Sequence, residues 1–262
     1  MIGSIIGDII GSRWEGTKHP KTENFLLFHK KCRFTDDTVL TCAIADVLMN
    51  GDSFTDAIRD YYRMYPERGY GSSFRRWATS ESQEGYGSYG NGSAMRVSPI
   101  AFFYDSSQEV LSEAEISAVA THNHEEGVRG AKVIALATFL ARKGKTKQEI
   151  ASAVEDLGCR TDVLLNSRAL GFDCSCQETV PQAINAFLYS SDFEDCIRRA
   201  IMMGGDSDTI ASMAGSIAHA YYRDIPPAFI EQSFRVMPQE LIDLTCAFMR
   251  TYIDKRSIVW RP

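Results

Sequence analysis

The sequence lacks the features that mark membrane proteins and multidomain chains. Its 262 residues contain no long hydrophobic run. The apolar stretch 1–10 has no basic leader and carries Asp8 after only a few apolar residues, which fits neither a signal peptide nor a membrane span. No stretch rich in proline, serine or one charge marks a linker. We expect a single domain spanning residues 1–262 that does not associate with membranes.

Cysteine is present in a pattern that favours neither disulfides nor zinc. The seven cysteines are scattered, are odd in number and form no pair of CxxC motifs. The simplest interpretation is a reducing cytoplasm. Cys174 and Cys176 could chelate a soft metal or be redox active, but two thiols alone in a predicted loop are more often without a role. We assign them none.

Excess charge of one sign is small. The formal net charge is −6, which argues against a broad phosphate-binding surface, although it leaves room for a local basic groove around Arg75 and Arg76. A hydrophobic content of 44% with 24% charged residues is ordinary for a globular protein with a sizeable core. We expect a monomer that forms no stable complex with nucleic acid.

Alternating, strand-like patterns are nearly absent as well. Apolar residues recur instead at spacings of three and four, the period of an amphipathic helix. Gly51, Ser53 and Pro238 lie where helix ends and starts are expected. These patterns predict an all-α, single, compact multi-helix domain. The expected helices cover about 2–13, 39–48, 55–65, 94–104, 112–121, 133–141, 147–156, 179–189, 193–202, 208–222, 227–234 and 239–253.

The first expected helix has glycine at every fourth position. Gly3, Gly7 and Gly11 share one face, which would let another helix approach closely. The stripe predicts a central, buried helix.

Two short acidic clusters lie far apart in the sequence, TDDT at 35–38 and GGDSDT at 204–209. Each has two carboxylates and a hydroxyl where a helix is about to begin, so each alone could simply be a helix cap. Brought together, four carboxylates would repel strongly unless cations were bound. Hard oxygen ligands call for Mg²⁺, Mn²⁺ or Ca²⁺. The pair of clusters therefore predicts a metal-dependent enzyme.

A glycine-dense loop precedes one of the expected helices. The run GYGSYGNGSAMR at 85–96 could present backbone N–H groups to a diphosphate, or be a flexible surface loop. His122 and His124 could bind metal or phosphate, although lone histidines are more often structural. Glu15 follows the glycine-striped helix, where a lone glutamate is usually just solvated.

Five segments, taken in order from Gly7 to about Gly215, resemble the ADP-ribosylglycohydrolase family. This family includes enzymes that remove ADP-ribose from modified dinitrogenase reductase. The segments are GDxxG through EG at 7–16, FTDDT at 34–38, GNG through MR at 90–96, TH at 121–122 and GDSDT at 205–209. Residues 123–126 and the short length depart from the better-known eukaryotic members, so the acceptor and linkage stay open.

The resemblance implies a metal-dependent hydrolase with two Mg²⁺ or Mn²⁺ ions that cleaves the bond between ADP-ribose and an acceptor, such as a modified protein side chain or a small ADP-ribose conjugate. The implied metal ligands are Thr35, Asp36, Asp37, Asp206, Asp208 and Thr209. Glu15 and Asp36 are the candidates for acid or base work. The implied substrate contacts are Asn91, Gly92, Ser93 and His122.

Two other functions compete with this interpretation. The pair Asp206 and Asp208 superficially matches the DxD of a haloacid dehalogenase-type phosphotransferase, but that motif should follow an apolar strand in an α/β domain. A non-catalytic ADP-ribose binder on the same scaffold is the alternative of a different class. Loss of metal carboxylates would mark such a binder, and all four carboxylates of the two clusters are present.

Overall fold

The structure is a computed structural model that describes residues 1–16, 20, 22–162 and 172–253. Within these residues the fold is all-α, as predicted, and the only β pairing is the isolated bridges Gly16–Gly205 and Gly90–Ser175. No helix of the described part is both long and apolar enough to cross a membrane.

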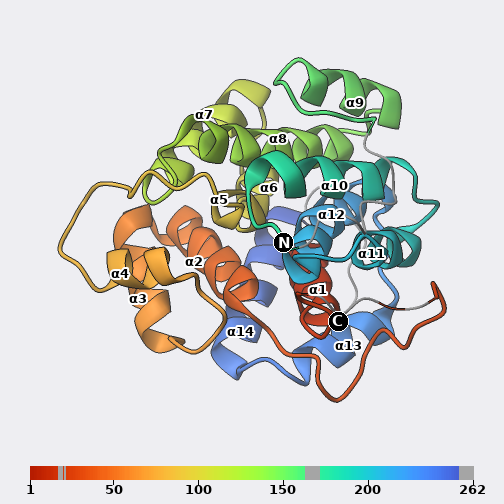
Figure 1. Cartoon of the computed structure of the whole chain (residues 1–262), viewed down its shortest axis with the longest axis horizontal. Coiled ribbons are helices and arrows are strands. Elements are labelled where there is room, and N and C mark those ends of the chain that lie inside the picture. Colours follow the sequence, from red (N-terminus) through yellow and green to blue (C-terminus); the bar gives the residue numbers. More distant parts are fainter. Residues whose placement is uncertain (17–19, 21, 163–171, 254–262) are drawn as a thin grey trace.

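The helices are joined by connections of very different length, the longest being the segments before α2 and before α10 (Figure 1). Their bounds are α1 Ile2–Gly11, α2 Asp36–Asn50, α3 Phe54–Met64, α4 Ser72–Ala78, α5 Gly92–Met95, α6 Ser98–Phe103, α7 Ser107–Val119, α8 Glu125–Arg142, α9 Lys147–Glu155, α10 Cys176–Leu188, α11 Phe193–Met202, α12 Ser207–Tyr222, α13 Pro227–Phe234 and α14 Gln239–Phe248.

Helix boundaries follow the local chemistry that the sequence carries. The Ser53 side chain accepts a hydrogen bond from the Asp56 N–H and caps α3. Gly51 ends α2 in the left-handed conformation, with φ of 83°. Pro238 directly precedes α14. These three predicted boundaries are confirmed.

Three details differ from the expected helices. The helix predicted over 94–104 is two short helices, α5 and α6, because Pro99 lacks an N–H and begins a new helix. Helix α4 was not predicted, since only seven residues form it. The segment predicted as helix to residue 253 changes after α14 to a π-helix, Met249–Ile253.

Helix α1 is the centre of the core and packs most extensively against α12 (Figure 1). Every residue of α1 is buried. Side chains added at Gly3, Gly7 and Gly11 would lie less than 3.0 Å from backbone atoms of α12. The Ser4 and Ser212 hydroxyls join the two helices at 2.7 Å. The predicted close helix approach and central position are confirmed.

We expect Gly7→Ala to lower the free energy of unfolding by about 2–3 kcal/mol or more, because its methyl group would meet the Ala211 carbonyl and separate α1 from α12. Urea denaturation measures the change. Gly71→Ala is the control, since no atom lies within 4 Å of the added carbon, and it should cost less than about 1 kcal/mol. Equal stability of the two variants would contradict this packing.

Candidate functional site

The contact between α1 and α12 places the second acidic cluster next to the end of α1. Gly11 lies against the backbone of Asp208, and the Ser207 hydroxyl donates to the Gly11 carbonyl at 3.2 Å. Gly204 and Gly205 have φ of 78° and 69°, so a β-carbon at either position would be strained. The glycine pair therefore shapes the turn that presents Asp206 and Asp208 at the start of α12.

The same turn also positions Glu15. The Gly16 N–H donates to the Gly205 carbonyl at 2.9 Å, which ties the chain after Glu15 to the turn before Asp206. Carboxylate oxygens of Glu15, Asp206 and Asp208 consequently lie within 4.8 Å of one another. Residues that the sequence suggested for two different roles thus form one acidic group.

The first acidic cluster is held by Asp8, a buried residue of α1. Its carboxylate accepts the Thr35 N–H at 3.0 Å, the Thr35 hydroxyl at 2.7 Å and the Thr38 N–H at 3.1 Å. The Thr38 hydroxyl makes a further short hydrogen bond to it. Asp8 thereby fixes the start of α2 against α1. This role was not predicted from the sequence, although a lone carboxylate in an apolar helix signals it.

Asp37 joins the two clusters across the site. Its Oδ2 atom accepts the Thr209 hydroxyl at 3.2 Å, and Thr35 Oγ1 lies 3.4 Å from the same atom. Its Oδ1 atom is buried and has no hydrogen-bond partner among the described residues. An unpartnered carboxylate oxygen beside other carboxylates is a strong indication that a cation belongs there.

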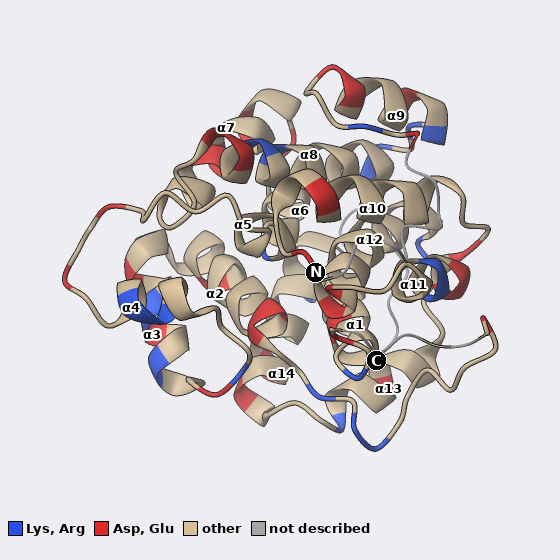
Figure 2. Cartoon of the chain, viewed as in Figure 1, with Lys and Arg blue, Asp and Glu red and all other residues tan. Residues whose placement is uncertain are grey.

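Burial and mutual repulsion dominate the electrostatics of this site. Burial, and then neighbouring Asp8, raise the pKa values of Asp36 and Asp37 well above the ordinary range. Burial and Asp206 do the same to the pKa of Asp208. Figure 2 shows acidic colour on α1 at the centre of the ribbon, basic colour on α4 and both colours on α11.

The cluster has little compensating positive charge. In the described parts of the chain the one ion pair that reaches it joins Arg33 and Glu15 at 3.7 Å. Carboxylate and hydroxyl oxygens are the donors that Mg²⁺, Mn²⁺ and Ca²⁺ prefer. The donor set and the uncompensated charge both fit divalent cations.

The carboxylates face a cavity of about 680 Å³, a volume typical of small-molecule sites. Among the residues predicted from sequence, its walls include Glu15, Asp36, Asp37, Asn91, Gly92, His122, Asp206, Asp208 and Thr209. The structure thus brings these residues together around one cavity.

Two predicted residues lie behind this wall, outside the cavity lining. Thr35 caps α2 and donates to Asp8. Ser93 is fully buried, and its hydroxyl donates to the Gly127 carbonyl at 2.7 Å. Asn91, by contrast, reaches the acidic group, because its Nδ2 donates to Asp206 at 2.7 Å.

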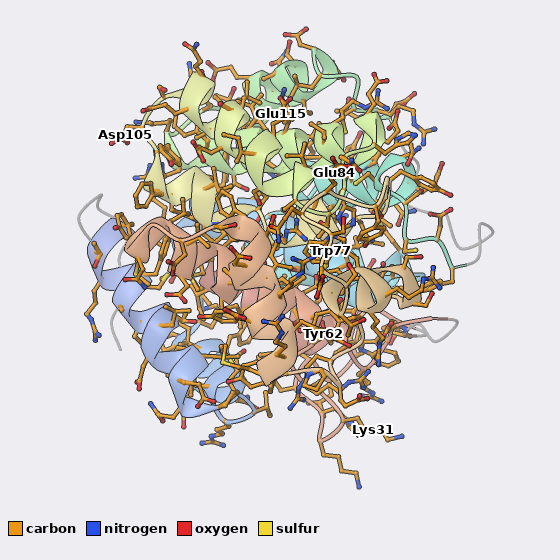
Figure 3. All side chains as sticks on the ribbon, turned by 90° about the vertical axis from the view of Figure 1, so that its left-hand side faces the viewer. Lys31, Tyr62, Trp77, Glu84, Asp105 and Glu115 are labelled. Atoms are coloured by element: carbon orange, nitrogen blue, oxygen red, sulfur yellow. The ribbon has the colours of Figure 1, made fainter. Side chains whose placement is uncertain are left out.

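The loop that carries the tyrosines and glycines of the cavity is attached at several points. The Trp77 indole N–H donates to the Glu84 carbonyl at 2.9 Å, and both residues are labelled in Figure 3. The Tyr86 N–H donates to the Thr121 carbonyl at 3.1 Å, and the Gly87 N–H to Asn123 at 2.6 Å. These bonds hold the glycine-dense segment against the residues around His122.

The other polar candidates have structural contacts. His124 is the N-cap of α8 and accepts the Glu126 N–H. The Cys176 thiol donates to the Gly90 carbonyl at 3.1 Å, and burial raises its pKa to about 12, which disfavours a reactive thiolate. The residues before Asp206 are α11 and the glycine turn rather than a strand, so the phosphotransferase alternative does not fit.

The family model and the similar proteins found by comparison all point to one family. The model of the ADP-ribosylglycohydrolase family matches residues 1–254. ADP-ribosylhydrolase ARH3 of Gallus gallus is 27% identical, covering 94% of this chain and 92% of the relative. ARH3 of Mus musculus is 30% identical, covering 85% of this chain and 82% of the relative.

A bacterial relative and a solved structure extend this comparison. ADP-ribosylarginine hydrolase Tri1 of Pseudomonas putida is 27% identical, covering 93% of this chain and 76% of the relative. A chain of an ADP-ribosylglycohydrolase-related protein complex has a TM-score of 0.71 at 26% identity and covers 96% of each chain. With the family match spanning nearly its whole length, the protein belongs to the ADP-ribosylglycohydrolase family.

Proposed function

We propose that the protein is a metal-dependent hydrolase that cleaves the glycosidic bond between ADP-ribose and an acceptor. The observation that carries this proposal is the set of buried, uncompensated carboxylates facing a cavity of about 680 Å³. A protein that only binds ADP-ribose has no need to keep charges that repel one another so strongly.

Two Mg²⁺ or Mn²⁺ ions would be held by the aspartates and hydroxyls of the two clusters. Thr209 contacts Asp37 directly, and Thr35 lies beside the same carboxylate. When bound, such ions would orient the hydroxyls of the distal ribose and stabilise charge in an oxocarbenium-like transition state. The proposed ligands are Thr35, Asp36, Asp37, Asp206, Asp208 and Thr209.

Glu15 and Asp36 are the proposed acid and base residues. Glu15 is partly exposed at the cavity, and burial together with the charge of Asp206 raises its pKa above the ordinary value. A carboxyl group with a raised pKa keeps its proton more readily at neutral pH, as protonation of a leaving group requires. Asp36 belongs to the other acidic cluster, at 35–38, and lines the same cavity. Its pKa is also raised.

The rest of the cavity suits the ADP-ribose moiety. Asn91, Gly92 and His122 line it, and we assign these three residues to diphosphate and ribose binding. Ser93, expected in the same role, lies directly behind them and donates its hydroxyl to the Gly127 carbonyl, so we assign it to support of this wall. The acceptor is a modified protein side chain such as arginine or serine, or a small conjugate. Because all seven cysteines are free, we further propose that the enzyme works in a reducing cytoplasm. We also propose that it is a monomer.

Release of free ADP-ribose from arginine-modified and serine-modified peptides tests the function, with Mg²⁺ or Mn²⁺ and again after chelation. Release that depends on the metal supports a hydrolase and identifies its linkage. Absence of release from both peptides, together with tight ADP-ribose binding by calorimetry, would favour the non-catalytic binder or another ADP-ribose conjugate as substrate.

We expect Asp208→Asn to abolish Mg²⁺ binding in calorimetry while leaving the fold intact, because it removes one charge from a group of repelling carboxylates. Asp60→Asn is the matched control, since Asp60 is exposed and pairs with Arg63 at the surface. Metal affinity should be unchanged in this control. Retention of full Mg²⁺-dependent activity in Asp208→Asn would refute the ligand assignment.

Glu15→Gln should slow turnover by about 10²–10⁴-fold, the usual contribution of a general acid or base. ADP-ribose affinity should stay within about threefold of the wild type, since the change removes a proton donor and leaves the shape of the cavity. Glu67→Gln, at an exposed position, is the control for loss of one carboxylate. Undiminished turnover in Glu15→Gln would exclude Glu15 from the acid or base role.

The raised pKa of Asp208 also predicts a pH effect on the metal-free protein. The folded wild type binds the Asp208 proton more tightly than the unfolded chain, so it loses stability as pH rises through the range between the two pKa values. Asp208→Asn has no such loss. The Tm advantage of Asp208→Asn over the wild type, both in chelator, should therefore grow as the pH rises from the ordinary carboxyl range toward neutral. A constant Tm difference across that range would contradict the raised pKa.

A further inference from the structure

Arg96 is a fully buried cation at the edge of the cavity. It lines the cavity and has no solvent exposure. Its Nη2 donates to the Ser117 carbonyl at 2.8 Å and to the Thr121 hydroxyl at 2.9 Å. No carboxylate of the described residues forms an ion pair with it, and its Nε and Nη1 have no acceptor there. Neutral groups, the Ser117 carbonyl and the Thr121 hydroxyl, therefore solvate the guanidinium charge in place of a carboxylate.

The Thr121 hydroxyl links Arg96 to His122 by hydrogen bonds. The Thr121 hydroxyl oxygen accepts from Arg96 and lies 2.6 Å from His122 Nδ1. A hydroxyl has a single proton, and no other acceptor among the described residues takes it. The Thr121 oxygen could also accept from an Nδ1–H, but its own proton would then be buried with no acceptor among the described residues. Donation of that proton to an unprotonated Nδ1 is the arrangement that satisfies both groups. The proton of a neutral His122 ring is then on Nε2.

The Nε2 edge of His122 faces the glycine loop. A β-carbon at Gly92 would lie 2.9 Å from His122 Cε1 and 3.0 Å from Nε2, so the ring edge occupies the space that a side chain there would need. A β-carbon at Gly90 would lie 3.6 Å from Nε2. No described residue accepts a hydrogen bond from Nε2, and His122 lines the cavity. The donor is therefore available to a ligand.

The surroundings keep this histidine uncharged. Burial, followed by the neighbouring guanidinium of Arg96, holds the pKa of His122 well below its ordinary value. Burial lowers the pKa of Arg96 only to about 10, so Arg96 stays charged at neutral pH. The Tyr86 ring lies tilted against the imidazole, with ring centroids 5.8 Å apart.

We propose that Arg96 and Thr121 are positioning residues that fix His122 as a neutral Nε2–H donor toward an oxygen atom of the bound ADP-ribose. This proposal rests on the proposed function in one respect, because that function identifies the ligand as ADP-ribose. Arg96 and Thr121 act through His122 and need not contact the ligand themselves. The arrangement supplies a hydrogen bond of fixed direction without adding a second cation next to the proposed metal ligands.

The wild-type protein alone gives the first test. Selective ¹⁵N labelling of histidine, with His122→Asn used for assignment, distinguishes the two neutral tautomers and the imidazolium by their chemical shifts at neutral pH. We expect the Nε2–H tautomer for His122. A signal typical of Nδ1–H or of imidazolium would overturn the proposal.

Thr121→Val and Thr121→Ser form the matched pair for the second test. Valine keeps the shape but loses the hydroxyl, so the His122 tautomer should become mixed and calorimetric ADP-ribose affinity should fall about tenfold. Serine keeps the hydroxyl and should retain both the tautomer and, within about threefold, the affinity. Wild-type affinity in Thr121→Val would contradict the positioning role.

These readouts separate the proposal from the hydrolase assignment. Neither the ¹⁵N shifts nor ADP-ribose affinity requires turnover, so a catalytically inactive protein would still give the expected tautomer and the expected difference between valine and serine. Conversely, an active hydrolase with His122 in the Nδ1–H form would retain the proposed function and lose this inference.

Discussion

The close contact between α1 and α12 is the constraint on which the site depends. Three glycines on α1 allow the helix backbones to approach until no side chain fits between them. At one end of this contact lies Asp208, and within α1 lies Asp8, which holds the start of α2. Two acidic clusters more than 160 residues apart in the sequence therefore meet because of a packing feature of the core.

The same contact creates an electrostatic problem within the protein. Carboxylates at the starts of α2 and α12 lie beside one another, and burial raises their pKa values. Such a group opposes folding unless protons or cations neutralise it. The Oδ1 atom of Asp37, which is buried without a hydrogen-bond partner among the described residues, is one group that a proton or cation would neutralise. A cation bound here would couple stability to ligand binding, since it would stabilise the fold and complete the proposed reaction site.

Much of this arrangement could be predicted from the sequence, because the signals are local. Helical periodicity, the glycine stripe and caps such as Ser53 depend on residues a few positions apart. The two acidic clusters were also visible, since each has an unusual density of carboxylates before a helix. The break between α5 and α6 was signalled by Pro99, whose effect the apolar pattern concealed.

Other features depend on contacts between residues far apart in the sequence, which no local pattern predicts. Asp8 and Thr35 are 27 positions apart, and Arg96 and Thr121 are 25 positions apart, so neither hydrogen bond has a local pattern. The orientation of Ser93 was likewise open, because a one-turn helix can present a hydroxyl to the cavity or to Gly127. Long-range polar contacts of this kind require the fold before they can be identified.

The proposed cation site lies between the carboxylates of the two acidic clusters. Crystals grown with Mn²⁺ and measured for anomalous scattering test it most directly, because the signal locates the ion independently of activity. We expect anomalous peaks bounded by the carboxylates of Asp36, Asp37, Asp206 and Asp208. A structure with Mn²⁺ bound only elsewhere, or with no peak between the two clusters at saturating Mn²⁺, would contradict it.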